Sequence, residues 1–351
     1  MGTVVRFSGA RRVEVVETED EALRPGSLRV RTLYSGISAG TELTAYRGTN
    51  PYLTRTWDAT RRLFADGADA PRYPLEGWGY SEVGMVTEVS PDVPDRPGAP
   101  AEGDVVWGIW GHRSEVVVPV STLDDHVLPA GLDPLAATFV RVGSVALNAV
   151  LAADVHLGET VTVFGQGVIG LLATRLVTLS GARVVACDAL RSRLDKAIEF
   201  GAASTVDVTT GSPAELARSI TDGRGADVAV ELSGNTRALH EAIRSVAVGG
   251  RVVAAGFYQG DAAGLRLGEE FHHNRVELVG SQIGGPPVRL AGRWDQDRMN
   301  RTFLRLAADG VVDPVGLVTH RVRVADVADA YELLDRRPAE ALQVVLDYTE
   351  D

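Results

Sequence analysis

The sequence has almost no cysteine and almost no lysine. Cys187 is the only cysteine among 351 residues, and Lys196 is the only lysine. A single cysteine excludes an intrachain disulfide and any multi-cysteine zinc site. Lysine chemistry such as a Schiff base would depend on Lys196, which lies on the outer side of a predicted helix, so we do not expect it.

Long apolar runs and an excess of positive charge are also missing. The chain contains no run of about 18 apolar residues, so no transmembrane helix is predicted. The formal net charge of −12 argues against nucleic acid or an anionic membrane surface as a partner. The first residues read directly into a strand, without a leader-like segment. We therefore expect a cytoplasmic protein whose partner is a small molecule.

The chain contains regions with two different patterns of apolar residues, which indicates an α/β protein with two domains. Residues 1–148 read as short strands broken by Gly, Pro and Asp, with strands predicted at 27–33, 84–89, 104–108 and 115–120. Residues 149–286 alternate apolar runs with amphipathic segments, which predicts βαβ units and a doubly wound parallel sheet. Strands are predicted there at 160–164, 183–187, 227–232, 251–255 and 277–280, and helices at 168–180 and 191–200. Residues 287–351 break this pattern and are predicted to return to the first domain, with helices at 297–309 and 324–336 and a strand at 341–346.

A glycine-rich turn at 165–170 predicts a dinucleotide site. Residues Gly165, Gln166, Gly167, Val168, Ile169 and Gly170 form a G-x-G-x-x-G that follows a predicted strand and opens a predicted helix. The first glycine permits the tight turn, the second lets a pyrophosphate approach the backbone, and the third allows close helix–strand packing. Asp188 ends the next strand, where a carboxylate accepts both ribose hydroxyls and repels a 2′-phosphate. NAD is therefore favoured over NADP, although Arg191 and Arg193 nearby leave NADP open. Ser233, Gly256 and Asn148 are further expected cofactor contacts.

The chain resembles the medium-chain dehydrogenase/reductase superfamily over nearly its full length. Residues 34–42 (YSGISAGTE) are similar to the S-G-I-C-G-T-D segment of zinc-type alcohol and sorbitol dehydrogenases. Residues 79–84 (GYSEVG) stand in the place of G-H-E-x-x-G, and the Rossmann stretch also fits. The resemblance implies a GroES-like β-rich catalytic domain, a Rossmann domain, and Asp188 with Arg193 at the adenosine ribose. The S-G-I-S-x-G-T-E form is similar to the branch of bacteriochlorophyllide a dehydrogenase and sugar or cyclitol dehydrogenases. We also expect a homodimer formed through edge strands of the Rossmann sheet.

The positions that hold catalytic zinc in the family carry other residues here. The cysteine position falls on Ser38 or Ala39, the histidine position on Tyr80, and the third ligand position on Arg141. A hydroxyl or methyl, a phenol and a guanidinium are not a zinc site. We therefore expect an enzyme without zinc or another catalytic metal.

Other groups must then stabilise the substrate oxygen during hydride transfer. Thr41 aligns with the hydroxyl residue that begins the proton relay of alcohol dehydrogenases, and Glu42 follows it. Tyr80 could reach the substrate oxygen or only pack, and Arg141 could clamp the substrate or pair with Glu42. His112 is a further candidate acid or base, with a structural role as the alternative. Asp58, Arg61 and Arg62, in the connection at 48–76, are plausible substrate contacts or a solvated face.

These observations predict a zinc-independent NAD-linked dehydrogenase, with NADP as the second choice. Its reaction would interconvert a secondary alcohol and a ketone on a polar substrate such as a sugar, aminosugar or cyclitol derivative of a biosynthetic pathway. Two alternatives stay open. One is a zinc-free NADPH-dependent enone or quinone reductase, against which Asp188 argues. The other is a non-catalytic nucleotide-binding or structural protein.

Overall fold

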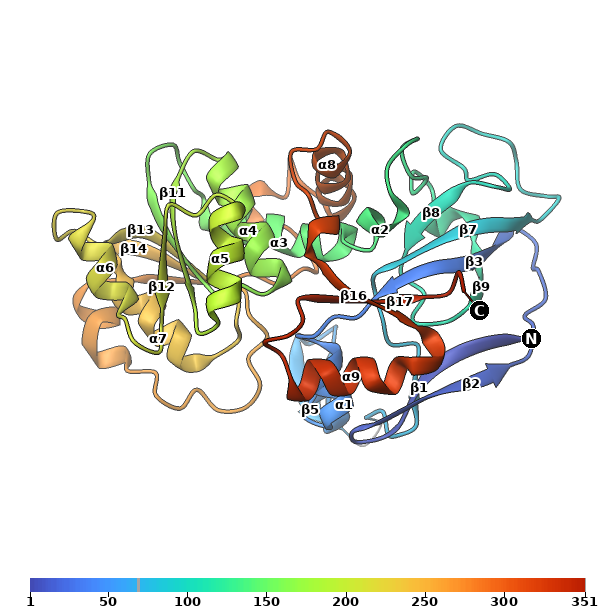
Figure 1. The fold of residues 1–351 in the computed structure, drawn as a ribbon, viewed down its shortest axis with the longest axis horizontal. Coiled ribbons are helices and arrows are strands. Elements are labelled where there is room, and N and C mark those ends of the chain that lie inside the picture. The colour runs from blue at the N-terminus through green and yellow to red at the C-terminus, as the bar shows by residue number, and fades with distance from the viewer. Residues whose placement is uncertain (68–69, 351) are drawn as a thin grey trace. The chain divides into compact units, whose positions relative to one another are not determined.

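The computed structural model describes residues 1–67 and 70–350, which form two compact units (Figure 1). Unit 1 comprises Met1–Arg141 and Asp313–Asp351, and unit 2 comprises Val142–Val312. No helix of the described residues is long and apolar enough to cross a bilayer.

Unit 1 is rich in strands, as its sequence predicts. One sheet has the order β16-β17-β3-β7-β8, with β9 also paired to β3, and a smaller sheet has the order β2-β1-β6. The elements are β1 (Gly2–Gly9), β2 (Arg12–Thr18), β3 (Ser27–Gly36), α1 (Glu42–Arg47), β4 (Arg55–Asp58), β5 (Leu63–Asp66), β6 (Leu75–Glu76), β7 (Glu82–Val89), β8 (Val105–Gly108), β9 (Glu115–Pro119), α2 (Pro134–Ala137), β16 (Val318–Arg323), α9 (Val327–Arg336) and β17 (Gln343–Asp347).

The core that positions the candidate site lies where α1 and α9 meet β1 and β17. Phe7, Tyr46 and Tyr331 pack their rings together there, with centroid separations of 5.2 to 6.4 Å. All three side chains are buried, and burial of an aromatic side chain is worth about 1.5–3 kcal/mol. This packing fixes α1, and with it the chain that leads from β3 into α1.

Unit 2 contains the predicted parallel sheet, in the order β12-β11-β10-β13-β14-β15. Its elements are α3 (Val140–Ala153, which begins in unit 1), β10 (Thr160–Phe164), α4 (Val168–Leu179), β11 (Arg183–Asp188), α5 (Arg191–Glu199), β12 (Ser204–Asp207), α6 (Pro213–Ser219), β13 (Ala226–Glu231), α7 (Thr236–Ser245), β14 (Val246–Ala254), β15 (Glu277–Gly280) and α8 (Gln296–Ala308). The helices α4 and α5 form one layer and α6 and α7 another, with the sheet between them (Figure 1). The predicted α/β fold with a Rossmann-like unit is confirmed.

The unit boundaries fall at 141/142 and 312/313, whereas the sequence patterns suggested 148/149 and 286/287. The later second boundary follows from the packing of α8. A Cβ on Gly143 would lie 2.3 Å from the Phe303 ring, so the glycine lets that ring approach α3. Ser144 also donates a hydrogen bond of 2.6 Å to Asn300. Helix α8 is therefore part of unit 2.

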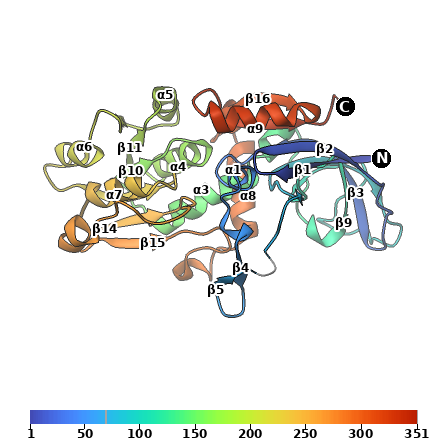
Figure 2. The same cartoon turned by 90° about the horizontal axis from the view of Figure 1, so that it is seen from below.

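The connection at 48–76 contains a two-stranded hairpin, β4 paired with β5, that the sequence reading did not predict. Figure 2 shows this hairpin standing out from the rest of unit 1. Asp58, Arg61 and Arg62 lie at its tip, and the Asp58 side chain accepts hydrogen bonds from the backbone of Thr60 and Arg61. Residues 68–69 of the connection lie outside the described residues.

Candidate active site and dinucleotide site

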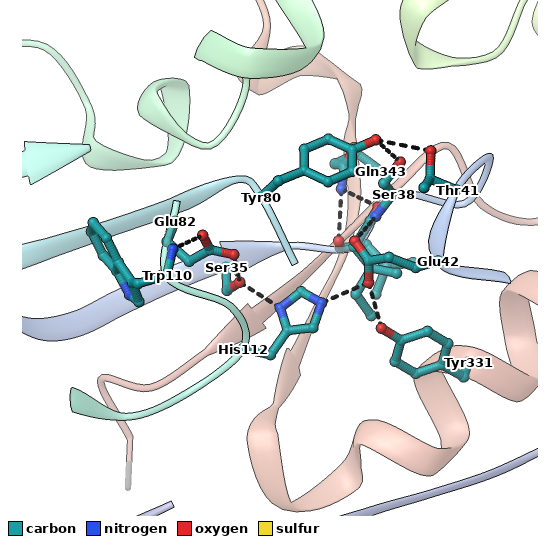
Figure 3. Close-up of polar contacts among 12 residues, drawn as sticks. Ser35, Ser38, Thr41, Glu42, Tyr80, Glu82, Trp110, His112, Tyr331 and Gln343 are labelled. Carbon is teal, nitrogen blue, oxygen red and sulfur yellow. Dashed lines mark hydrogen bonds and ion pairs between the residues drawn. The ribbon is translucent and has the colours of Figure 1, made fainter. Parts of the chain in front are cut away.

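Glu42 is a completely buried carboxylate at the start of α1 (Figure 3). Its Oε1 accepts a hydrogen bond of 2.8 Å from the backbone N–H of Ser38. Its Oε2 lies 2.7 Å from His112 Nε2 and accepts a hydrogen bond of 2.5 Å from the Tyr331 hydroxyl. The ion pair with Arg141 that the sequence left open is therefore not formed, because His112 and Tyr331 occupy the carboxylate instead.

His112 continues this chain of contacts to a second buried carboxylate, Glu82. The Nδ1 atom of His112 lies 2.6 Å from Ser35 Oγ, which is 3.0 Å from Glu82 Oε1. The backbone N–H of Trp110 donates to Glu82 Oε2 at 2.9 Å. We call Glu82, Ser35, His112 and Glu42 the acid–histidine chain.

The polypeptide backbone at residue 79 can pass close to Glu82 and His112 only because that residue is a glycine. Gly79 has a φ of +111°. A Cβ at that position would lie 2.7 Å from Glu82 Oε1 and 2.9 Å from the His112 ring. The first glycine of the 79–84 motif therefore makes room for the acid–histidine chain.

Burial and charge act in opposite directions on these groups. Burial alone would lower the pKa of His112, but the Glu42 carboxylate, assisted by Glu82, outweighs it, so the pKa is raised. Burial raises the pKa of Glu82, against the opposing effect of His112. Burial likewise raises the pKa of Tyr331, and Glu42 adds to the effect.

Tyr80 stands beside the acid–histidine chain, within a group of three hydroxyls (Figure 3). The Tyr80 hydroxyl is hydrogen-bonded to Ser38 Oγ and donates a longer bond of 3.4 Å to Thr41 Oγ1. We call Ser38, Thr41 and Tyr80 the hydroxyl cluster. Burial raises the pKa of Tyr80, and its hydrogen bonds with Ser38 and Thr41 oppose that shift.

Arg141 supplies positive charge near the hydroxyl cluster. It lies in the first turn of α3 and is partly buried, and its guanidinium has no hydrogen bond or ion pair with any described residue. Its charge favours the phenolate of Tyr80, whereas Glu42 opposes it. Burial lowers the pKa of Arg141. An unpaired guanidinium beside a phenol is suited to hold an oxygen that becomes negative.

The residues present do not fit a catalytic zinc in this unit. Tyr80, at the expected histidine position, is hydrogen-bonded to Ser38, one of the two candidates for the cysteine position, and the expected third position holds the cation Arg141. Zinc sites in proteins use thiolate, imidazole and carboxylate ligands. Among the described residues, one group of three side chains has the spacing of a metal site, and it lies in unit 2: His240, Glu269 and Glu270.

The glycine-rich turn of unit 2 has the geometry that a dinucleotide requires. Gly165 has a φ of +84°, and its N–H donates to the carbonyl of Cys187 at 2.8 Å. A Cβ on Gly170 would lie 1.7 Å from the Gly165 carbonyl oxygen, so only glycine fits. At Gly167 a Cβ would meet nothing nearer than Arg193 Nη1 at 4.0 Å, so the turn is open there. Val168 and Ile169 begin α4, whose N-terminus points its free N–H groups to this turn.

Asp188 ends β11 beside this turn, and its carboxylate is held in place by backbone groups. Oδ2 accepts a hydrogen bond of 2.6 Å from the N–H of Gln166, and Oδ1 accepts one of 2.8 Å from Leu190. Each oxygen keeps a second lone pair for a ribose hydroxyl. The Gln166 side chain points inward, bonded to Val163 and Thr174, so only its backbone faces the turn.

Two of the other expected cofactor residues, Ser233 and Gly256, are held by Glu231 at the end of β13. Glu231 is completely buried and accepts hydrogen bonds from both the N–H and the hydroxyl of Ser233, from the Gly234 N–H and from the Tyr258 hydroxyl. The N–H of Gly256 donates to its carbonyl at 2.9 Å. Asn148, on α3, donates its amide to the carbonyls of Gln282 and Gly285, and its own Oδ1 is buried without a hydrogen bond to any described residue.

The sequence analysis named Glu42, His112, Tyr80, Thr41 and Arg141 as candidates but did not name the further partners of Glu42 and His112. Glu82, Ser35 and Tyr331 complete the site, and Glu231 does so in unit 2. Glu82 lies inside the 79–84 motif and Ser35 inside the 34–42 motif, but neither motif indicated that these two side chains would contact His112 and each other. Tyr331 reaches Glu42 through the packing of a distant segment.

Known proteins resemble this chain in both sequence and fold. A family profile described as zinc-binding dehydrogenase matches residues 168–321. A D-guloside 3-dehydrogenase of Shigella flexneri is 29% identical over 94% of this chain and 95% of its own length. The 2-desacetyl-2-hydroxyethyl bacteriochlorophyllide A dehydrogenase of Cereibacter sphaeroides is 26% identical over 99% of this chain and 98% of its own. The crystal structure of 2R,3R-butanediol dehydrogenase from Bacillus subtilis matches with a TM-score of 0.78 at 22% identity, covering 99% of both chains.

Proposed function

Because this chain belongs to the medium-chain dehydrogenase/reductase superfamily, we propose that it oxidises a secondary ring hydroxyl of a sugar-like substrate without a catalytic metal. It is a nicotinamide-dependent oxidoreductase that acts on a CH–OH group. The observation that supports the metal-free part is the hydrogen bond between Tyr80, at the expected histidine position of a zinc site, and Ser38, one of the two candidates for its cysteine position.

The dinucleotide is assigned to unit 2. The open backbone at Gly167 and the N-terminus of α4 would take the pyrophosphate, and Asp188 would take the adenosine ribose. A carboxylate beside the 2′ position favours NAD over NADP. The nicotinamide, when bound, supplies the hydride acceptor.

The hydroxyl cluster and Arg141 are assigned the stabilisation of the substrate oxygen, the role expected of zinc in zinc-dependent dehydrogenases. The Tyr80 hydroxyl would bond the substrate hydroxyl and take its proton during oxidation, with Ser38 and Thr41 holding the phenol in place. Arg141 would stabilise the alkoxide as it forms, because its positive charge is unpaired among the described residues. General acid–base catalysis of this kind contributes typically 10²–10⁴-fold in rate.

A sugar-like substrate is favoured by the names of similar proteins. These include D-guloside 3-dehydrogenase, L-galactonate-5-dehydrogenase and sorbitol dehydrogenase. The first covers nearly the whole of both chains, and its name specifies a secondary carbon of a glycoside. We therefore infer a pyranoside or polyol that loses two hydrogens at one secondary carbon to give a ketone.

Steady-state kinetics with the purified full chain tests this proposal. NAD or NADP would be offered with a panel of hexosides and cyclitols, and separately NADPH with enones and quinones. We expect reduction of NAD with at least one glycoside and formation of the ketone, seen by NMR. Reduction of enones alone would favour the reductase alternative. Dinucleotide binding without turnover of any substrate would favour the non-catalytic alternative.

We further propose a homodimer formed through β15. This strand is the last of the six-stranded sheet, and its Leu278 side chain is 39% exposed. An unpaired edge strand readily adds a second copy of itself. Light scattering should give twice the mass of 37.3 kDa, and Leu278→Arg should give the monomer.

A further inference from the structure

The acid–histidine chain contains two buried carboxylates and only one basic group. Glu42 and Glu82 are both 0% exposed, and His112 is 1% exposed. Among the described residues, no arginine or lysine pairs with either carboxylate. Two buried carboxylate charges beside one imidazole would be costly, because each loses its hydration. The site is therefore most stable when the protons of the chain are shared so that one charge is neutralised.

The hydrogen bonds allow two arrangements of these protons. The contact between Glu82 and Ser35 needs one hydrogen, and the contact between Ser35 and His112 Nδ1 needs another. In the first arrangement Glu82 is protonated and donates to Ser35, which donates to a neutral His112. In the second, an imidazolium donates to Ser35, which donates to the Glu82 carboxylate. Both contain the same number of protons.

We propose that the acid–histidine chain is a proton-transfer line whose state controls the ionisation of Tyr80. In the transfer, the O–H bond of Glu82 breaks as Ser35 gains that proton, and the former Ser35 proton forms the N–H bond of His112. Nothing is oxidised, and no net charge enters or leaves. The result is that Glu42 faces an imidazolium in place of an imidazole. The inference deepens the function proposed above, since Tyr80 is the acid–base group there.

Glu42 transmits this change to the hydroxyl cluster. Its Oε1 accepts the N–H of Ser38, and the Ser38 hydroxyl is bonded to Tyr80. The charged groups that act on Tyr80 are Glu42, on α1, which disfavours the phenolate, and Arg141, on α3, which favours it. An imidazolium against Glu42 offsets the first influence, so it makes the Tyr80 proton easier to remove.

His112 and Glu82 are thus positioning residues, and Tyr80 is the residue that touches substrate. Tyr331 also donates a hydrogen bond to Glu42. Its pKa is raised by burial, by Glu42 and by Tyr348, so its hydroxyl keeps its proton while the line transfers one. The role of Tyr331 is to hold the carboxylate in place. This separates a structural partner of Glu42 from a titrating one.

The experiment measures Tyr80 ionisation directly in the full chain without substrate. The protein is labelled with 3-fluorotyrosine, and the Tyr80 resonance is identified by its loss in Tyr80→Phe and followed by ¹⁹F NMR against pH. In His112→Gln, we expect the ionisation constant of Tyr80 to fall by about tenfold or more, because the positive charge that pairs with Glu42 is lost and Glu42 disfavours the Tyr80 phenolate. Thr162→Val is the matched control, because it removes a buried strand hydroxyl in unit 2 whose hydrogen-bond partner is Ser245 and not a residue of the line. It should leave the Tyr80 titration unchanged, and an unchanged titration in His112→Gln would overturn the proposal.

A second measurement protects the test against a variant that does not fold. In ¹⁵N-histidine-labelled protein, Glu82→Gln should lower the pKa of His112, because the carboxylate stabilises the imidazolium. Ser35→Ala should remove most of that sensitivity to Glu82. If His112 titrates identically in both variants and the parent, the line does not exist. Neither measurement needs turnover, so a protein that oxidises no sugar would contradict the proposed function while these titrations still decide the inference.

Discussion

The Nε2 atom of His112 lies 2.7 Å from Oε2 of Glu42, and both side chains are completely buried. The two residues are 70 positions apart in the sequence. This contact joins the start of α1 to the segment that follows β8. It therefore ties the chain before α1, which carries Ser38 and Thr41, to the main sheet of unit 1.

Removal of the Glu42 charge should destabilise the protein. Glu42→Gln leaves His112 and Tyr331 without their carboxylate acceptor, and breaking a buried pair in this way costs about 3–5 kcal/mol in the free energy of unfolding. Urea denaturation measures it. Glu332→Gln, which removes an exposed carboxylate on α9, should change that free energy by less than about 0.5 kcal/mol. Equal free energies of unfolding for the two variants would show that the buried pair does not stabilise the fold.

Loss of the Tyr80 hydroxyl should reduce turnover and leave cofactor affinity unchanged. Tyr80→Phe removes the group assigned to proton transfer, so kcat should fall by roughly 10²–10⁴-fold. The dissociation constant of NADH, measured by fluorescence, should stay the same, because unit 2 is unaltered. Tyr52→Phe, at an exposed tyrosine of the same unit, should leave both values unchanged. A Tyr80→Phe enzyme with full activity would reduce Tyr80 to a packing residue.

Alanine substitutions of the two later glycines of the turn should affect the protein in different ways, one through stability and the other through cofactor binding. Gly170→Ala forces a Cβ to within 1.7 Å of a carbonyl oxygen, so the melting temperature should fall and cofactor binding should be lost. Gly167→Ala meets no close neighbour in the protein, so the fold should persist while the dinucleotide binds weakly. Thermal melting and NADH titration separate these outcomes. Tight NADH binding by Gly167→Ala would mean that the pyrophosphate does not approach this backbone.

The charge of Asp188 should decide the choice of cofactor. Asp188→Asn keeps one of the two oxygens that accept backbone N–H groups of the turn and removes the charge that repels a 2′-phosphate, so the preference for NAD over NADP should fall roughly tenfold, or about 1.4 kcal/mol. Comparison of kcat/KM for the two cofactors measures it. Asp207→Asn alters the carboxylate at the end of the neighbouring strand β12 and should not change the ratio. A parent enzyme with no preference would contradict the assignment of Asp188.

The sequence predicted those parts of the molecule that local patterns determine. Strand β10, the turn at Gly165 and helix α4 follow from an apolar run, three glycines and an amphipathic segment. The hairpin β4–β5 was not predicted, because its turn uses Arg62 at a φ of +53°, where a glycine or asparagine would have marked it. Its paired aromatics, Trp57 opposite Phe64, are its only sequence indication.

The candidate site was predicted residue by residue but not as an arrangement. Tyr80, Thr41 and Glu42 came from their alignment with family motifs, and His112 came from its residue type. Their partners could not be found in the same way, because Tyr331 reaches Glu42 from 289 positions away through the packing of α9. Contacts of that kind depend on the whole fold of unit 1, which no local pattern contains.

Metal analysis of the active enzyme tests the central claim, catalysis without zinc, most directly. Protein produced with added zinc would be analysed by mass spectrometry and assayed before and after treatment with a chelator. His240→Ala serves as the matched variant, since it removes the group of unit 2 that could hold adventitious metal. We predict well under one zinc per chain in that variant, with sugar oxidation unchanged by the chelator. One zinc per chain that persists in His240→Ala, and whose removal abolishes activity, would contradict the account.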